Sequence, residues 1–217
     1  MTKFVWGLVA LWCVTGWGFI SSAQEVKPDN QELKLETEEA KYETGKLMQR
    51  RTFYRDAEGQ KVDHGRYYYW FPNGNMSQDT QYKHGKRDGK QIVYHFSGGK
   101  ESEQFWVDGK QEGKEQWWDE NGVLYRVCEY KNDMPDGVWT WYYPPTKATE
   151  NIKVSEQHWK EGLKNGPWKW WYANGQLGIS GQYQDHRQHG TWKYFDEAGK
   201  QTEVREYRDG ELVVKAP

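Results

Sequence analysis

Aromatic and polar residues alternate in a pattern that repeats along most of the chain. Each copy opens with a glycine, and successive opening glycines lie 24, 24, 24, 29 and 24 residues apart. The opening glycines are Gly65, Gly89, Gly113, Gly137, Gly166 and Gly190. The position five residues further on is aromatic in all six copies, at Trp70, Tyr94, Trp118, Tyr142, Trp171 and Phe195. A fixed period of this length indicates a repeat architecture and outweighs residue-by-residue assignment.

Each copy has the pattern of a β-hairpin. A second glycine usually stands nine residues after the first, and it follows asparagine at Asn73, Asn121 and Asn174. Asn-Gly between two aromatic-rich runs predicts a tight type I′ turn, in which both central residues have positive φ. The stretch 82–89 and its equivalents predict a second, glycine-containing turn that joins one hairpin to the next. Asp133 and His186 replace a glycine there, and histidine suits positive φ less well. The predicted fold class is therefore all-β, a repeat array of antiparallel hairpins.

The two-residue period of a strand predicts which face of the sheet some positions occupy, but it does not decide this for position five. Positions two and four after the opening glycine share a face of the predicted strand. Position five falls on the other face, unless a bulge returns it to the same one. The sequence is compatible with both arrangements.

Two copies depart from the regular pattern. A degenerate first copy begins near Tyr42, with Gly45, Leu47 and Phe53 in register. The 29-residue step contains an insertion around 144–147, which we interpret as a lengthened hairpin loop. The predicted organisation is a signal peptide over 1–23, a polar acidic linker over 24–38, and the repeat domain over 39–217.

The N-terminus has the three parts of a secretory signal peptide. Lys3 is followed by an apolar run of about 17 residues and by the small residues Ser21, Ser22 and Ala23. The alternative is an uncleaved anchor, for which this run is at the short limit. Bulky residues before Cys13 argue against a lipid anchor. We expect an exported protein, periplasmic, envelope-associated or extracellular, with no transmembrane segment after cleavage.

The repeat resembles a known family. Units of glycine, two aromatics and Asn-Gly, closed by a tyrosine before the next turn, are similar to the bacterial variant of the MORN repeat, whose proteins are often labelled YwqK-type antitoxins. The resemblance covers roughly residues 40–214. It implies hairpins side by side in one elongated, twisted, single-layer meander, in which each unit depends on its neighbours. It also implies an antitoxin or immunity role, which for an exported protein requires a target outside the cytoplasm.

Composition narrows the classes of partner and the source of stability. The formal net charge is −2, so no strongly basic field exists to hold nucleic acid. Removal of the signal peptide leaves Cys128 as the single cysteine, which excludes an internal disulfide. A small, semi-buried strand residue is the favoured interpretation of Cys128, with a reactive thiol as the alternative. Of 14 tryptophans, 11 follow residue 23, so the sheet is expected to bury aromatic rings.

The chain shows no catalytic motif, and we expect no enzyme. The acidic groups that could be imagined as an acid–base pair, Asp119 with Glu120 and Glu101 with Glu103, fall at a predicted turn and on a solvated strand. His64, His84, His186 and His189 lie in or near inter-hairpin turns. Turns one unit apart are expected to lie roughly 10 Å from each other, too far to share a zinc ion. We therefore predict no metal and no cofactor.

Tryptophans gather in the last three hairpins. The excess over the repeat pattern is at Trp139, Trp141, Trp168, Trp170 and Trp192. These rings either supply the buried face of a thin sheet or form a binding stripe. The leading functional hypothesis is a non-enzymatic scaffold that presents this surface to another protein. The alternative is binding of envelope carbohydrate or peptidoglycan, and the sequence does not separate the two. The apolar run 212–214 is a candidate for an unprotected edge strand.

Overall fold

The computed structural model describes residues 33–145 and 151–216. The predicted signal peptide and most of the predicted linker lie outside the described residues. The described part contains 17 strands in one sheet, and none of its residues is helical. The strands are β1 Glu36–Lys41, β2 Leu47–Arg55, β3 Lys61–Trp70, β4 Met76–Lys83, β5 Lys86–Tyr94, β6 Lys100–Val107, β7 Lys110–Gln111, β8 Gly113–Trp118, β9 Leu124–Lys131, β10 Met134–Pro135, β11 Gly137–Tyr142, β12 Lys153–Lys160, β13 Leu163–Trp171, β14 Leu177–Gln184, β15 Arg187–Phe195, β16 Gln201–Arg208 and β17 Glu211–Ala216.

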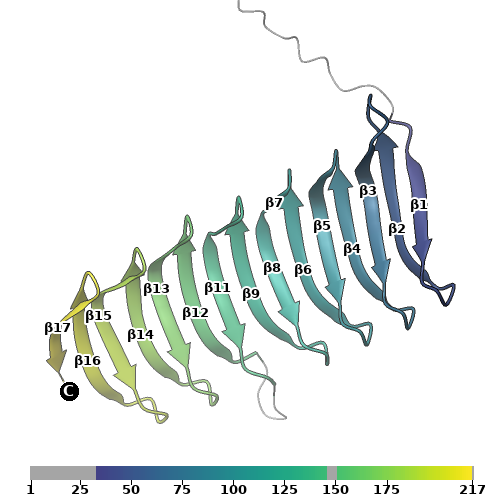
Figure 1. Cartoon of the computed structure of the whole chain (residues 1–217). Helices are drawn as coiled ribbons and strands as arrows, with labels where there is room; N and C mark the ends of the chain where they lie inside the picture. Colours follow the sequence, from purple (N-terminus) through teal and green to yellow (C-terminus); the bar gives the residue numbers. More distant parts are fainter. Residues whose placement is uncertain (1–32, 146–150, 217) are drawn as a thin grey trace, which may run out of the picture. The chain divides into compact units, whose positions relative to one another are not determined.

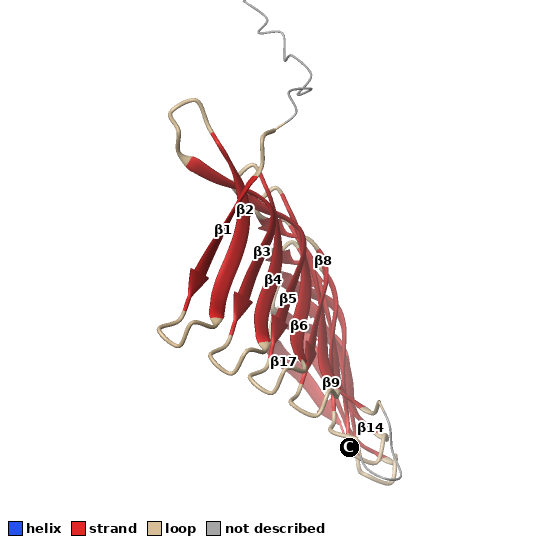
Figure 2. Ribbon diagram, turned by 90° about the vertical axis from the view of Figure 1, so that its right-hand side faces the viewer, coloured by secondary structure: helices blue, strands red, loops and turns tan. Residues whose placement is uncertain are grey.

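The sheet is an antiparallel meander, as the sequence predicts. Strands pair in chain order, from β1 with β2 through to β16 with β17. The two-residue strands β7 and β10 are the first parts of interrupted strands that continue as β8 and β11. Figure 1 shows the strands side by side in one layer, and Figure 2 shows turns at both ends of the strands.

The Asn-Gly turns do not have the type I′ geometry that the sequence predicts for them. In the Asn-Gly turn after β3, Gly74 donates to the Phe71 carbonyl and the Phe71 amide donates to Asn75. Gly74 has φ of 99°, whereas Asn73 is not among the residues with positive φ. This pattern is typical of a three-residue loop with a single left-handed glycine, so the predicted type I′ turn is wrong at this position. Asn73 instead uses its side-chain oxygen to accept the Asn75 amide.

Type I′ geometry occurs at the other end of the strands, in the turns that join one hairpin to the next. Both central residues have positive φ, for example 49° and 79° at His84 and Gly85. Asp133 and His186 adopt the same conformation, each with φ of 68°. Side-chain contacts help to hold them: Asp133 accepts the Gln111 amide at 2.7 Å, and His186 Nδ1 accepts the Lys164 amide at 3.3 Å.

The opening glycines lie within strands rather than in the turns. Between β4 and β5, Thr80 faces Gln91 and Tyr82 faces Arg87, so three residues around Gly89 oppose one residue of β4. The six opening glycines have φ between 66° and 111°. They therefore form β-bulges, which favour glycine because a side chain is strained at positive φ.

Position five lies on the face opposite to positions two and four. Within β3, Tyr67 contacts Tyr69 with ring centroids 5.0 Å apart, and Tyr68 contacts Trp70 at 5.7 Å. The irregularity beside Trp70 is on the partner strand, where the register skips from Gln78 to Met76. We call the surface with positions two and four the aromatic face, and the surface with positions three and five the opposite face.

Most of the buried residues lie on the aromatic face. They are Phe53, Thr80, Gln91, Ser102, Glu115, Cys128, Ser155, Trp192 and Tyr207, whereas Asp79 and Thr140 are buried on the opposite face. Small residues stand across from large rings, as Ser102 does from Trp117 and Ser155 from Trp170. Such cross-strand pairs allow a single layer to bury apolar area without a second sheet. Cys128 is fully buried rather than semi-buried.

The degenerate first copy is a complete hairpin. β1 and β2 are joined by a turn in which Tyr42 and Gly45 repeat the hydrogen bonds of the later Asn-Gly turns. The first strand begins at Glu36, three residues before the predicted domain boundary. The insertion lies between the paired strands β11 and β12, where the Tyr143 amide donates to the Ile152 carbonyl. Residues 146–150 of that loop lie outside the described residues.

Candidate binding surface

The five predicted tryptophans come from three strands of one sheet. β11 supplies Trp139 and Trp141, β13 supplies Trp168 and Trp170, and β15 supplies Trp192. Residues of β12 stand between the first two pairs: Gln157 faces both Trp139 and Trp168, and Ser155 faces both Trp141 and Trp170. The structure thus brings the predicted residues together on the aromatic face.

The rings form three packed groups. Trp139 lies 5.0 Å from Trp159 and 5.9 Å from Trp141, centroid to centroid, and its indole nitrogen donates to the Glu129 carbonyl at 3.0 Å. Trp168 is stacked on Trp192 at 5.4 Å. Trp170 meets Tyr172 edge-on at 4.6 Å. Contacts within each group fix the orientation of the rings.

Two glycines of β14 make room for these rings. A Cβ atom on Gly181 would lie 2.2 Å from Trp192 Cδ2, and one on Gly178 would lie 2.3 Å from Trp170 Cζ3. Neither glycine has positive φ, so the reason for glycine is the close approach of a ring. The repeat pattern does not indicate these residues, because they stand outside its glycine positions.

Exposure separates Trp192 from the other four tryptophans. Trp192 is 2 % exposed because it packs against the rings of Trp168, Tyr183 and Tyr207. Trp139, Trp141, Trp168 and Trp170 are half-buried and reach the surface. Trp192 is therefore a packing residue beneath the surface, which corrects its assignment as a contact residue. We call the other four side chains the tryptophan patch.

Cationic side chains cover aromatic rings elsewhere on the aromatic face. Arg87 lies 4.1 Å from the centroid of Trp106, and Arg126 lies 4.6 Å from that of Trp117. Arg126 also lies 3.7 Å from Glu115, a buried carboxylate. Among the described residues, no cation–π contact involves a ring of the tryptophan patch. The patch is the part of this face where indoles meet solvent without a charged cover.

The candidate acids have structural partners. Asp119 accepts the backbone amides of Val123 and Asn121 in its own turn, and these hydrogen bonds lower its pKa. Burial alone would raise the pKa of Glu103, but hydrogen bonds from Lys100 and Lys90 outweigh burial and lower it. Both acids are thus ionised groups held by nearby donors.

Histidines approach more closely than the sequence predicts. The rings of His64 and His84 are 5.0 Å apart, instead of the expected separation of roughly 10 Å, because His64 lies in β3 and reaches the turn that contains His84. His64 Nδ1 accepts the His84 amide at 3.4 Å. Within residues 33–145 and 151–216, no three His, Cys, Asp or Glu side chains form a group suited to a metal ion.

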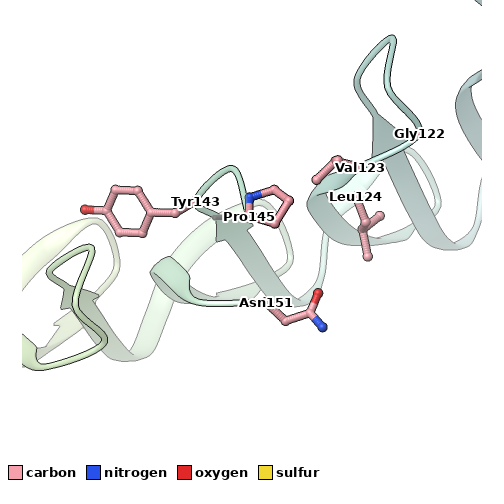
Figure 3. A pocket seen from close by; sticks show the side chains of 6 residues that line it. All are labelled: Gly122, Val123, Leu124, Tyr143, Pro145 and Asn151. Atoms are coloured by element: carbon pink, nitrogen blue, oxygen red, sulfur yellow. The ribbon is translucent and has the colours of Figure 1, made fainter. Parts of the chain in front are cut away.

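One hollow of the described surface offers little chemistry. It has a volume of about 250 Å³ and lies beside the turn between β8 and β9 (Figure 3). Its lining is Gly122, Val123, Leu124, Tyr143, Pro145 and Asn151. These residues supply an apolar wall and an amide, but no acid–base pair, and the Tyr143 ring points away from the other side chains (Figure 3). In the described part of the chain, no helix has the length and apolar character needed to cross a membrane.

The chain is similar to a known repeat family. The family described as MORN repeat variant matches residues 63–84, 111–132, 164–185 and 188–209. Each match begins two residues before an opening glycine and ends at the first central residue of a type I′ turn. The hairpins between these matches have the same strand pairing. No curated protein sequence matches the chain. A repeat array of this kind suggests a binding scaffold, since stacked repeats offer extended surfaces.

Proposed function

We propose that the protein is an exported, non-enzymatic scaffold that binds another protein through the tryptophan patch. The observation that carries this proposal is the set of four half-buried indoles on adjacent rows of one face, free of the cationic cover seen over Trp106 and Trp117. Tryptophan dominates the energetic centres of protein interfaces because one side chain buries a large apolar area at low entropic cost.

The geometry of the patch favours a protein over a sugar. Trp139 and Trp141 are inclined at 55° to each other, and Trp170 is inclined at 68° to Tyr172. Rings splayed in this way form an uneven apolar surface, which suits protruding side chains better than the stacking face of a pyranose ring. Ser155 and Gln157 supply neutral hydrogen-bonding groups between the rings. Aromatic residues around a few polar groups are typical of interface cores.

Export and the absence of catalysis rest on different observations. The charged start, apolar run and small residues before residue 24 support export. The engagement of Asp119 and Glu103 with structural partners supports a non-enzymatic role. If the partner is a toxin, as the antitoxin label of similar repeat proteins suggests, the toxin acts outside the cytoplasm.

Affinity capture with matched tryptophan variants tests the proposal. Trp170 and Trp171 are neighbours on β13 but lie on opposite faces, and Trp171 has Lys153 over its ring. We expect Trp170→Ala to weaken binding of the captured envelope protein at least tenfold, and Trp171→Ala to leave it within about threefold. Thermal melting of both variants verifies that the sheet is folded.

Three results would contradict the proposal. The first is that no envelope or extracellular protein is retained. The second is that both variants lose the partner equally while still folded. The third is sedimentation with purified peptidoglycan that Trp170→Ala abolishes, which would assign the patch to a glycan instead.

A further inference from the structure

A lysine side chain lies beside the tryptophan patch, between two further rings of the aromatic face. The Nζ atom of Lys164 lies 5.5 Å from the ring centroid of Trp159 and 5.5 Å from that of Tyr183. Both rings also contact the patch: Trp159 lies 5.0 Å from Trp139, and Tyr183 lies 6.5 Å from Trp168, centroid to centroid. Two series of ring contacts therefore join the patch to the ammonium group.

The strand holds Lys164 in this place. Lys164 lies in β13, four residues before Trp168, and it faces Trp159 of β12. Its amide donates to His186 Nδ1 at 3.3 Å, and its side chain is half-buried. A lysine stem that packs along rings keeps its charged end in water. At about 3.3 Å per residue, the Cα atoms of Lys164 and Trp168 are no more than roughly 13 Å apart.

Lys164 has no ionic partner, unlike most cations over rings of this face. Arg126 and Arg205 lie over rings, and each has a carboxylate partner, at 3.7 Å and 2.8 Å. Arg87, in β5, donates to Gln91 instead. Within residues 33–145 and 151–216, no carboxylate oxygen lies within 4.0 Å of the Lys164 Nζ atom. No neighbouring carboxylate therefore neutralises its charge.

We infer that the protein partner of the tryptophan patch contacts Lys164 through the carboxylate of an aspartate or a glutamate. This inference rests on the proposed function and adds the chemistry of the partner. The matching segment has apolar side chains for the indoles and an acidic side chain within roughly 13 Å of them. Exclusion of water by the partner strengthens the attraction between ammonium and carboxylate, whereas a basic segment meets a like charge. Lys164 thus selects acidic over basic partners.

The number of free cations favours a single carboxylate over a more extended anion. A lipid surface or a polyanion is attracted by several clustered cations. Among the cations that the structure describes, only Lys164 lies over rings that contact the patch. One ammonium group is matched by one acidic side chain.

Selection from a random peptide library displayed on phage tests the inference, with the protein purified from the producing cell and immobilised. We expect the unaltered protein to enrich peptides that combine apolar residues with aspartate or glutamate. Lys164→Gln should lose the acidic preference and keep the apolar one, and Lys164→Glu should enrich basic peptides instead. Lys164→Arg keeps the charge and should behave as the unaltered protein. Lys160→Gln is the matched control, an exposed lysine next to Trp159 in sequence, and should change nothing.

A double-mutant cycle with the most enriched peptide measures the contact itself. Replacement of the acidic residue of the peptide by its amide, or Lys164→Gln in the protein, should each weaken binding about five- to tenfold. The two changes together should weaken binding no more than either alone, because they remove the same contact. High salt should weaken binding to the unaltered protein and leave binding to Lys164→Gln unchanged.

The outcomes separate this inference from the proposed function. Apolar peptides without an acidic preference, or two replacements whose effects add, would overturn the inference and leave the proposed function standing. Enrichment that Trp170→Ala does not alter would contradict both. Sedimentation with phosphatidylglycerol vesicles that Lys164→Gln abolishes, with no peptide enriched, would assign the lysine to a lipid headgroup and overturn the inference. Thermal melting of each variant verifies that the sheet is folded, so a change in binding reports on the contact.

Discussion

Single residues in the last third of the sheet are matched to the rings that face them. Gly178 and Gly181 lie against Trp170 and Trp192, where the ring occupies the space of a Cβ atom. The sequence predicts the tryptophans and their shared face. It does not predict that Trp192 is buried or that two glycines are needed beneath the rings, because burial depends on which residues the register brings together across three strands.

Replacement of Gly181 by alanine tests this match. The Trp192 ring cannot move aside because Trp168, Tyr183 and Tyr207 contact it. We expect Gly181→Ala to lower the free energy of unfolding by about 1–3 kcal/mol, the usual cost of overpacking. Gly99→Ala is the control, since the nearest atom to its Cβ would be the Glu120 carbonyl oxygen at 4.0 Å. Equal urea midpoints for the two variants would show that the ring adapts.

Side-chain hydrogen bonds link neighbouring hairpins at the end of the strands where the Asn-Gly turns lie. The side chain six positions after the opening glycine donates to a carbonyl of the next unit, as Tyr143 does to Trp171 at 3.0 Å and Tyr172 to Phe195 at 2.9 Å. His95 makes the same contact with Trp118 at 2.9 Å. Because this position holds either tyrosine or histidine, the sequence pattern does not show that these side chains make the same contact.

Removal of one such hydroxyl measures the coupling between hairpins. Tyr172→Phe deletes the donor to Phe195 and keeps the ring, and we expect a loss of about 0.5–1.5 kcal/mol in unfolding free energy. Phe71 occupies the same repeat position and packs on Phe96 at 5.2 Å, so the repeat accepts a phenylalanine ring there. Chemical denaturation of the two proteins provides the comparison. An unchanged stability would mean that water replaces the phenol as donor.

At the element scale, the sequence predicts the hairpins but assigns the wrong type to the Asn-Gly turns. Asn-Gly is a strong signal for a turn, and the turn is present. Its backbone is decided by loop length: a three-residue loop needs a single left-handed residue, which Gly74 supplies. Type I′ geometry occurs at Asn132 with Asp133 and at Asp185 with His186. These residue types rarely adopt positive φ by themselves, and hydrogen bonds from the preceding unit hold them in this conformation.

The sheet carries several half-buried phenols, and its stability is therefore sensitive to alkali. Burial raises the pKa of Tyr130 to about 12, with a further contribution from Glu115, and burial likewise raises the pKa of the Cys128 thiol to about 12. Burial also raises the pKa of Tyr183 and Tyr194. In the unfolded chain phenols ionise near pH 10 and thiols near pH 8.5.

The sign of the pH effect follows from proton binding. Between about pH 9 and 12 the folded protein retains protons that the unfolded chain has lost, so stability is full at lower pH and falls as the pH rises. We expect the urea midpoint to be lower at pH 11 than at pH 8, with a smaller drop in Tyr130→Phe. Equal midpoints at the two pH values would show that these side chains become solvated before the sheet unfolds.

The contacts between successive type I′ turns give the array a direction. The second central residue of each turn donates its amide to a carbonyl of the preceding unit, as Gly85 does to Asp63, Gly109 to Arg87 and Gly162 to Pro135. Each turn is completed by residues that come earlier in the chain. During synthesis or passage through a membrane pore, a new hairpin therefore meets a finished edge and adds to it, with only local contacts to search for. The sheet can therefore grow from its N-terminal end one hairpin at a time.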